Sequence, residues 1–220
     1  MKIAIILAFL IHISPLSDAQ TIGSIFISLP KDCIPDLNIS QKKFLLKNKE
    51  YILPGGDSLE TIKYTIAVDE KNQYLSCKMN FTTGQNGFSI IQIRKFIKKD
   101  GGSLIVFSRY GGLLHSYFQD EIRCFNSRNN KLTEIKNKPL PDSIGINRFF
   151  KSNTPDSLRV KLGSYISTSN DLRPELENAI AFKIFSQVND GEAEKYIIGN
   201  SMHFIWTGLK FRESKIKNSD

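Results

Sequence analysis

The feature that most constrains this fold is an alternation of apolar and polar residues between Thr61 and Phe81. Two runs of apolar side chains fall on alternate positions: Ile62, Tyr64, Ile66 and Val68, then Leu75, Cys77, Met79 and Phe81. Turn-forming residues, Asp69 to Asn72, separate the runs. Because side chains of a strand alternate between two faces, this pattern predicts a half-buried antiparallel hairpin.

The pattern continues toward the C-terminus. Further strands are predicted in the segments Phe88 to Ile97, Leu104 to Tyr110 and, within a more ambiguous stretch, Leu113 to Phe125. Turns are predicted where glycines gather: Gly84 to Gly87, Asp100 to Gly102 and Gly111-Gly112. Ile91, Ile93 and Ile97 are in phase, as are Ile122 and Cys124. The spacing favours an antiparallel β-meander over residues 60–126.

The flanking segments have a different character. In residues 20–59, the segment Ile25 to Leu37 is predicted to be an irregular lead-in or a single helical turn, and a short helix from Ser40 to Lys47 follows. In residues 127–220, a polar loop up to Pro141 precedes a helix starting at Asp156 or Ser157. A stronger helix is predicted after Pro174, with Leu176, Ile180 and Ile184 on one side, and strand-like material follows it. We therefore predict one α+β domain, an antiparallel β-meander sheet packed with C-terminal helices.

The first residues have the features of a cleavable signal peptide. Lys2 precedes an apolar stretch from Ile3 to Ile13, and Ser17-Asp18-Ala19 places small residues at a cleavage site. This predicts residues 1–19 as the signal and cleavage after Ala19. The apolar run is too short to span a bilayer, and no later segment is a better candidate. We expect an exported protein, periplasmic or extracellular, with no transmembrane span after cleavage.

The net charge bears on which partners the protein could bind, and the cysteines bear on disulfides and metal sites. The formal net charge of +8 suits an anionic envelope component, although lysines that merely solubilise the surface explain it too. Few aromatic residues interleave with the basic ones, so no nucleic acid is expected as a partner. Cys33, Cys77 and Cys124 allow at most one internal disulfide, and buried thiols are the simpler expectation. Their spacing indicates no metal site, and no cofactor motif is present.

Catalysis has weak candidates. His115 follows a glycine pair, with Asp120 and Glu121 nearby, and Cys124 would be a possible nucleophile. A histidine oriented by a carboxylate is typical of general-base catalysis, but the chain contains no G-x-S-x-G or H-E-x-x-H motif. A structural or surface role for His115 is the more ordinary interpretation.

Binding candidates come from charge density and aromatic content. The densest basic cluster is Arg94, Lys95, Lys98 and Lys99, which would bind an anion or protect an edge strand. His203 and Trp206 alternate with apolar neighbours near the C-terminus. Trp206 would contact a sugar or a partner, or it would pack a sheet against the core.

The order of several features resembles an uncharacterised family of exported Bacteroidetes proteins. The features are the signal, the segment Phe26 to Leu37, the short helix, and the strands that contain Gln73 to Leu75 and Ser103 to Val106. The resemblance implies a periplasmic or secreted bacterial protein and no particular activity. The leading hypothesis is a non-catalytic protein that binds an envelope or extracellular partner, such as an anionic component or another exported protein. The alternatives are a small hydrolase or transferase using His115, and a binder of anionic lipid or glycan.

Overall fold

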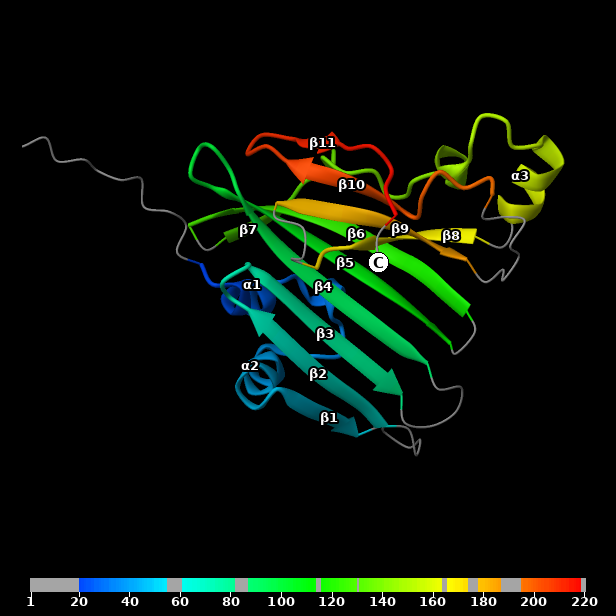
Figure 1. The fold of residues 1–220 in the computed structure, drawn as a ribbon. Helices are drawn as coiled ribbons and strands as arrows, with labels where there is room; N and C mark the ends of the chain where they lie inside the picture. Colours follow the sequence, from blue (N-terminus) through cyan, green and yellow to red (C-terminus); the bar gives the residue numbers. More distant parts are fainter. Residues whose placement is uncertain are drawn as a thin grey trace, which may run out of the picture.

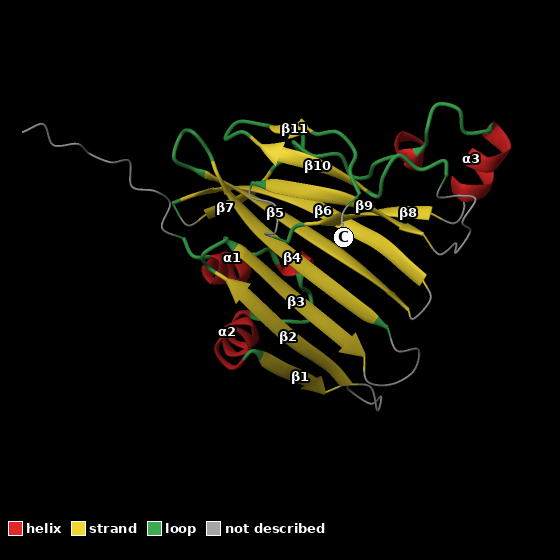
Figure 2. Ribbon diagram, in the orientation of Figure 1, coloured by secondary structure: helices red, strands yellow, loops and turns green. Residues whose placement is uncertain are grey.

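A computed structural model describes residues 20–54, 61–81, 87–113, 116–129, 131–163, 166–173, 178–186 and 195–218. Within these ranges the chain is mostly β, and strands dominate the view in Figure 2. Two antiparallel sheets, of seven and four strands, account for the strands. The prediction of an α+β fold packed with C-terminal helices is wrong.

The large sheet is a meander in which every strand pairs with its neighbours in sequence. Its strands are β1 (Glu50–Pro54), β2 (Thr61–Asp69), β3 (Tyr74–Phe81), β4 (Phe88–Ile97), β5 (Ser103–Leu113), β6 (Ser116–Arg128) and β7 (Lys131–Glu134). The predicted hairpin is confirmed, since Ile66 lies opposite Cys77 and Val68 opposite Leu75. Strand β5 continues through Gly111-Gly112, so these glycines do not end it as predicted. Strand β7 lies within the segment predicted as a loop.

Two helices cover one face of the large sheet. They are α1 (Ile22–Ser28) and α2 (Ile39–Asn48), joined by the short 3-10 helix η1 (Lys31–Cys33). Asn38 and Gln41 form a capping box at the start of α2. The N-cap is therefore Asn38, two residues before the predicted cap, Ser40. The segment from Ile25 was expected to be irregular or a single helical turn, yet α1 forms from Ile22, and its Ile22, Ile25 and Phe26 are fully buried against the sheet. These side chains form the first core with the alternating face of β2 and β3.

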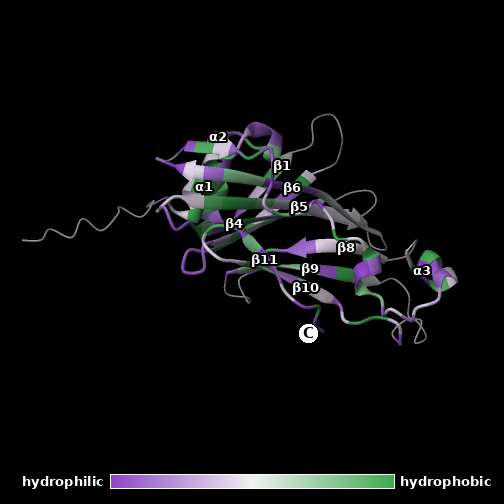
Figure 3. Cartoon of the chain, turned by 90° about the horizontal axis from the view of Figure 1, so that it is seen from above, coloured by the Kyte–Doolittle hydropathy of each residue, from purple (hydrophilic) through white to green (hydrophobic). Residues whose placement is uncertain are grey.

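The small sheet covers the opposite face of the large sheet, over β4, β5 and β6. Its strands are β8 (Ile166–Asp171), β9 (Ala179–Ser186), β10 (Ser201–Trp206) and β11 (Phe211–Glu213), in the order β11-β10-β9-β8. The second core lies between the sheets and contains Val106, Cys124 and Phe182. Seen from above, the molecule has three layers: helices, large sheet and small sheet (Figure 3).

The strong helix predicted after Pro174 is replaced by strand β9. Ile180 and Ile184 satisfy a helical spacing of four, but Phe182 lies between them and shares their face in a strand. Phe182 is 1% exposed and packs edge-on against Phe204 of β10 at 5.2 Å. The sequence is compatible with both a helical and a strand periodicity here, and the contact of Phe182 with Phe204 favours the strand.

The helix predicted at Asp156 is present as α3 (Asp156–Gly163), close to the 3-10 helix η2 (Ile146–Phe149). It buries Leu162 with Phe150 in a small cluster at one end of the molecule and does not cover a sheet (Figure 1). Among the described residues, no helix is long and apolar enough to cross a membrane.

Candidate functional site

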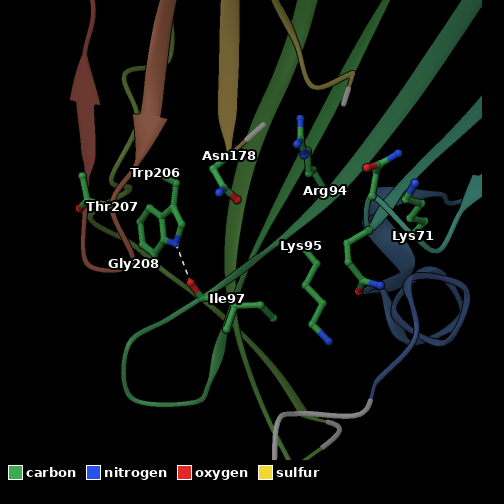
Figure 4. Close-up of a pocket in the computed structure, with 10 residues that line it drawn as sticks. Lys71, Arg94, Lys95, Ile97, Asn178, Trp206, Thr207 and Gly208 are labelled. Carbon is green, nitrogen blue, oxygen red and sulfur yellow. Dashed lines mark hydrogen bonds between the residues drawn. The ribbon is translucent and has the colours of Figure 1, made fainter. Parts of the chain in front are cut away.

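A cleft of about 560 Å³ opens where the two sheets meet at one end of the molecule. Its size falls in the range of about 300 to 1,000 Å³ that is usual for ligand sites. Three parts of the chain line it: the β2–β3 turn with Lys71, Asn72 and Gln73; the end of β4 with Arg94, Lys95 and Ile97; and a small-sheet group formed by Asn178, Trp206, Thr207 and Gly208. Figure 4 shows these side chains, and we call this site the basic cleft.

The charge of the basic cleft is one-sided. Lys71, Arg94 and Lys95 are cationic, and none of the described residues that line the cleft is acidic. Another cleft of about 600 Å³, beside β6 and β7, differs because its acidic and basic residues are balanced. There Arg123 pairs with Glu134, and Lys138 pairs with Asp142. The basic cleft is therefore the one suited to a negatively charged ligand.

Arg94 projects from β4 toward the small sheet and is 5% exposed. Its Nη1 donates to the carbonyl oxygens of Leu172, Arg173 and Ala179 at 3.2, 2.9 and 3.2 Å. Its guanidinium also lies 5.3 Å from the ring centroid of Phe96. Desolvation lowers the pKa of Arg94, but guanidinium groups remain protonated in proteins. Hydrogen bonds to carbonyl oxygens fix the position of this cation, and the carboxylates of Asp171 and Asp69 act on its charge.

Lys95 is the next residue and points away from Arg94, because neighbouring strand residues face opposite ways (Figure 4). It is 7% exposed, and its Nζ donates to the carbonyl oxygen of Gln20 at 2.7 Å. The backbone N–H of Lys95 donates to the carbonyl oxygen of Gln73 at 3.0 Å, which ties β4 to the β2–β3 turn. These contacts give one wall of the basic cleft a fixed shape.

Gln73 carries a buried side-chain oxygen, Oε1, that has no hydrogen-bond partner among the described residues. Its Nε2 donates to the carbonyl oxygen of Glu70 at 2.5 Å. A buried acceptor without a donor has a free-energy cost, and its burial keeps it out of reach of a ligand in the cleft.

Trp206 forms the opposite wall. It is 8% exposed, its Nε1 donates to the carbonyl oxygen of Ile97 at 2.7 Å, and its ring packs with Phe96 and Phe211. Its ring therefore belongs to the core, with one edge at the cleft. Trp206 is the single tryptophan of the chain, so it reports on this wall alone.

The other binding candidates lie outside the basic cleft. Lys98 and Lys99 are on the adjacent β4–β5 turn, where the Lys98 Nζ contacts Asn126 and the Lys99 N–H donates to the carbonyl oxygen of Gly208. His203 is 8% exposed and lies beneath the C-terminal segment, where Ser214 N–H donates to its carbonyl oxygen. Burial, with Lys217 and Lys183 nearby, lowers the pKa of His203.

The catalytic candidates are not brought together in the described structure. His115 lies outside the described residues, and of Asp120 only the backbone, in β6, is described. Glu121 forms ion pairs with Arg109 at 3.3 Å and Arg123 at 3.5 Å. Cys124 is fully buried between the sheets, where desolvation raises its thiol pKa to about 12. A protonated, buried thiol is a poor nucleophile. Among the described residues, no group of three or more His, Cys, Asp or Glu side chains is placed to hold a metal ion.

Charge density identified Arg94 and Lys95, and the rarity of tryptophan identified Trp206. Lys71, Asn72, Gln73 and Asn178 were missed as site residues. Lys71 and Asn72 were predicted as part of a turn between strands and Gln73 as the start of a strand, and neither pattern indicates a ligand site.

Comparison with known proteins supports the fold alone. No family model and no curated protein matches the chain. A solved structure, described as a domain of an uncharacterized protein from Porphyromonas gingivalis W83, is similar with a TM-score of 0.61 and 12% sequence identity. The match covers 87% of this chain and 96% of that chain. The protein therefore shares its fold with an uncharacterised domain from a Bacteroidetes bacterium.

Proposed function

We propose that the protein is exported and acts as a non-catalytic binding protein that holds an anionic group of an envelope or extracellular partner in the basic cleft. The carrying observation is that Lys71, Arg94 and Lys95 line the cleft and that none of its described lining residues is acidic. A ligand with a carboxylate, such as a uronic acid of a glycan, carries the charge that these cations would bind.

Export is supported by the sequence of residues 1–19, which has the features of a cleavable signal peptide. Gln20, the first residue after the proposed cleavage site, is 6% exposed, and its Oε1 accepts a hydrogen bond from Ser127 Oγ at 2.6 Å. Helix α1 starts two residues later, with Thr21 as its N-cap. All these contacts join residues that remain after cleavage.

Calorimetric titration tests the ligand. We expect D-glucuronate and inorganic phosphate to bind, and D-glucose not to bind, with affinity falling as salt is added. Lys71→Gln removes one exposed cation of the cleft and should weaken glucuronate binding about tenfold, the usual scale of a hydrogen bond to a charged group. Lys131→Gln, an exposed change on β7, is the matched control and should leave binding unchanged. Equal binding of glucose, or equal loss in both variants, would contradict the proposed ligand class.

The mass of the protein from its native host tests export. We expect the intact chain to begin at Gln20 and to occur in the envelope or culture fraction. A cytosolic protein that retains Met1 would contradict export, while leaving the titration of the cleft as an independent result.

A further inference from the structure

Two turns from different sheets are fastened together beside the basic cleft. They are residues 98–102, between β4 and β5, and residues 207–210, between β10 and β11; we call them the paired turns. Lys99 N–H donates to the carbonyl oxygen of Gly208 at 3.0 Å. Beneath them, the rings of Phe96, Trp206 and Phe211 have centroids 5.0 to 6.1 Å apart. The aromatic support and the cross-sheet bond make the paired turns a rigid projection at one end of the molecule (Figure 1).

Large apolar side chains are exposed on this projection. Leu209, at the tip of the second turn, is 70% exposed. Ile97, at the base of the first turn, is 49% exposed. Leu209 follows Gly208 and Ile97 lies two residues before Lys99, so both are close in sequence to the hydrogen bond between the turns. When an apolar medium covers apolar side chains that were exposed to water, the free energy of the system falls.

Cations surround these apolar side chains. Lys98 and Lys99 are on the first turn, and Lys210 and Arg212 are at and after the second. The nearby acids are Asp100, which accepts a hydrogen bond from Gly102 N–H, and Glu213, which pairs with Arg148. Positive charge therefore predominates around the exposed Leu209 and Ile97.

We propose that the paired turns dock the protein onto an anionic lipid bilayer. Leu209 and Ile97 enter the boundary between headgroups and acyl chains, and the four cations contact the negatively charged headgroups. A bilayer fits this surface because the turns project and present long, exposed basic side chains, which need no matching groove on a partner. The inference goes beyond the ligand of the basic cleft and does not depend on it.

Vesicle flotation tests the docking. We expect the protein to float with vesicles of phosphatidylcholine and phosphatidylglycerol, to bind pure phosphatidylcholine far less, and to dissociate in high salt. Leu209→Ser should weaken binding about tenfold, on the scale of burying one leucine side chain. The double variant Lys210→Gln/Arg212→Gln should weaken it about 25-fold, since each cation near an anionic surface contributes about fivefold.

Matched changes on α2 provide the control. Ile39, 60% exposed, Lys43 and Lys47 belong to α2, which packs on β1 and β2, away from the paired turns (Figure 1). Ile39→Ser and Lys43→Gln/Lys47→Gln should leave flotation unchanged, and thermal unfolding should show every variant folded. Wild-type flotation by Leu209→Ser, equal binding to neutral vesicles, or equal losses in the α2 controls would each overturn the docking. Glucuronate binding should survive Leu209→Ser, so failure of one proposal is distinguishable from failure of the other.

Discussion

Arg94 shows how a single buried side chain can join two sheets. It extends from the large sheet and donates to three carbonyl oxygens, two just after the end of β8 and one at the start of β9. Gln92, two residues earlier on the same face, adds a parallel link because its Oε1 accepts from Leu172 N–H at 3.1 Å. These polar contacts continue the interface where the apolar core ends, and they shape one wall of the basic cleft.

Replacing Arg94 should therefore destabilise the whole fold. Arg94→Leu leaves several buried carbonyl oxygens without donors, and we expect it to lower the free energy of unfolding by about 3 kcal/mol. Arg212→Leu, an exposed change on β11, should alter it by less than about 0.5 kcal/mol. Urea denaturation of both variants is the measurement. A loss below about 1 kcal/mol for Arg94→Leu would mean that the link between the sheets lies elsewhere.

A second prediction at the scale of single residues concerns the reactivity of the three cysteines. Cys33, Cys77 and Cys124 are free and buried, and desolvation raises each thiol pKa to about 12. Because the pKa is raised, each thiol stays protonated until the pH approaches 12, and only thiolates react rapidly. We expect no alkylation by N-ethylmaleimide at pH 8 in the folded protein, and three additions in urea. Rapid labelling of the folded protein would contradict the burial described.

At the scale of elements, the hydrogen bond between the paired turns depends on the backbone conformation of Gly208. Its φ of +87° is left-handed, and an added Cβ would lie 2.8 Å from Lys99 Cγ. Gly208→Ala should cost about 1 to 2 kcal/mol of unfolding free energy, from the backbone conformation alone. Gly145→Ala is the control, because nothing lies within 4 Å of its added Cβ. Thermal unfolding compares the two, and equal melting temperatures would show that the turn tolerates a side chain.

The elements that the sequence predicts well are those whose contacts are local. The β2–β3 hairpin follows from alternation on both sides of a four-residue turn, and the pairing of Ile66 with Cys77 agrees with it. Strand β9 was misread because Ile180 and Ile184 fit a helical period as well as a strand period. The full extent of helix α1 was missed because Pro30 and Pro35 suggested irregular chain or a single helical turn, although both lie after the helix ends at Ser28.

The candidate site was predictable only in part, for the same reason. Arg94 and Lys95 stand out as charge in a strand, whereas Lys71 and Asn178 become neighbours only when the sheets pack. Contacts between such distant segments leave no periodic signal in one sequence. The turn at Lys71 was predicted correctly as a turn, but its role in a cleft depends on the second sheet.

At the scale of the whole molecule, the two proposed binding features share one end. The basic cleft lies where the β2–β3 turn, the end of β4 and the β10–β11 turn converge, and the paired turns border it (Figures 1 and 4). Gly208 belongs to both, since it lines the cleft and accepts the hydrogen bond from Lys99. A protein docked through the paired turns would therefore hold the cleft close to the membrane surface.

Trp206 fluorescence tests the central claim, that the basic cleft binds an anion, most directly. It is the chain's single tryptophan, and its Nε1 bonds to Ile97 at the cleft wall. We predict a saturable change in its emission as D-glucuronate is added, a weaker response in Lys71→Gln, and none with D-glucose. Emission that stays constant while calorimetry records binding would place the ligand elsewhere and contradict the assignment of the cleft.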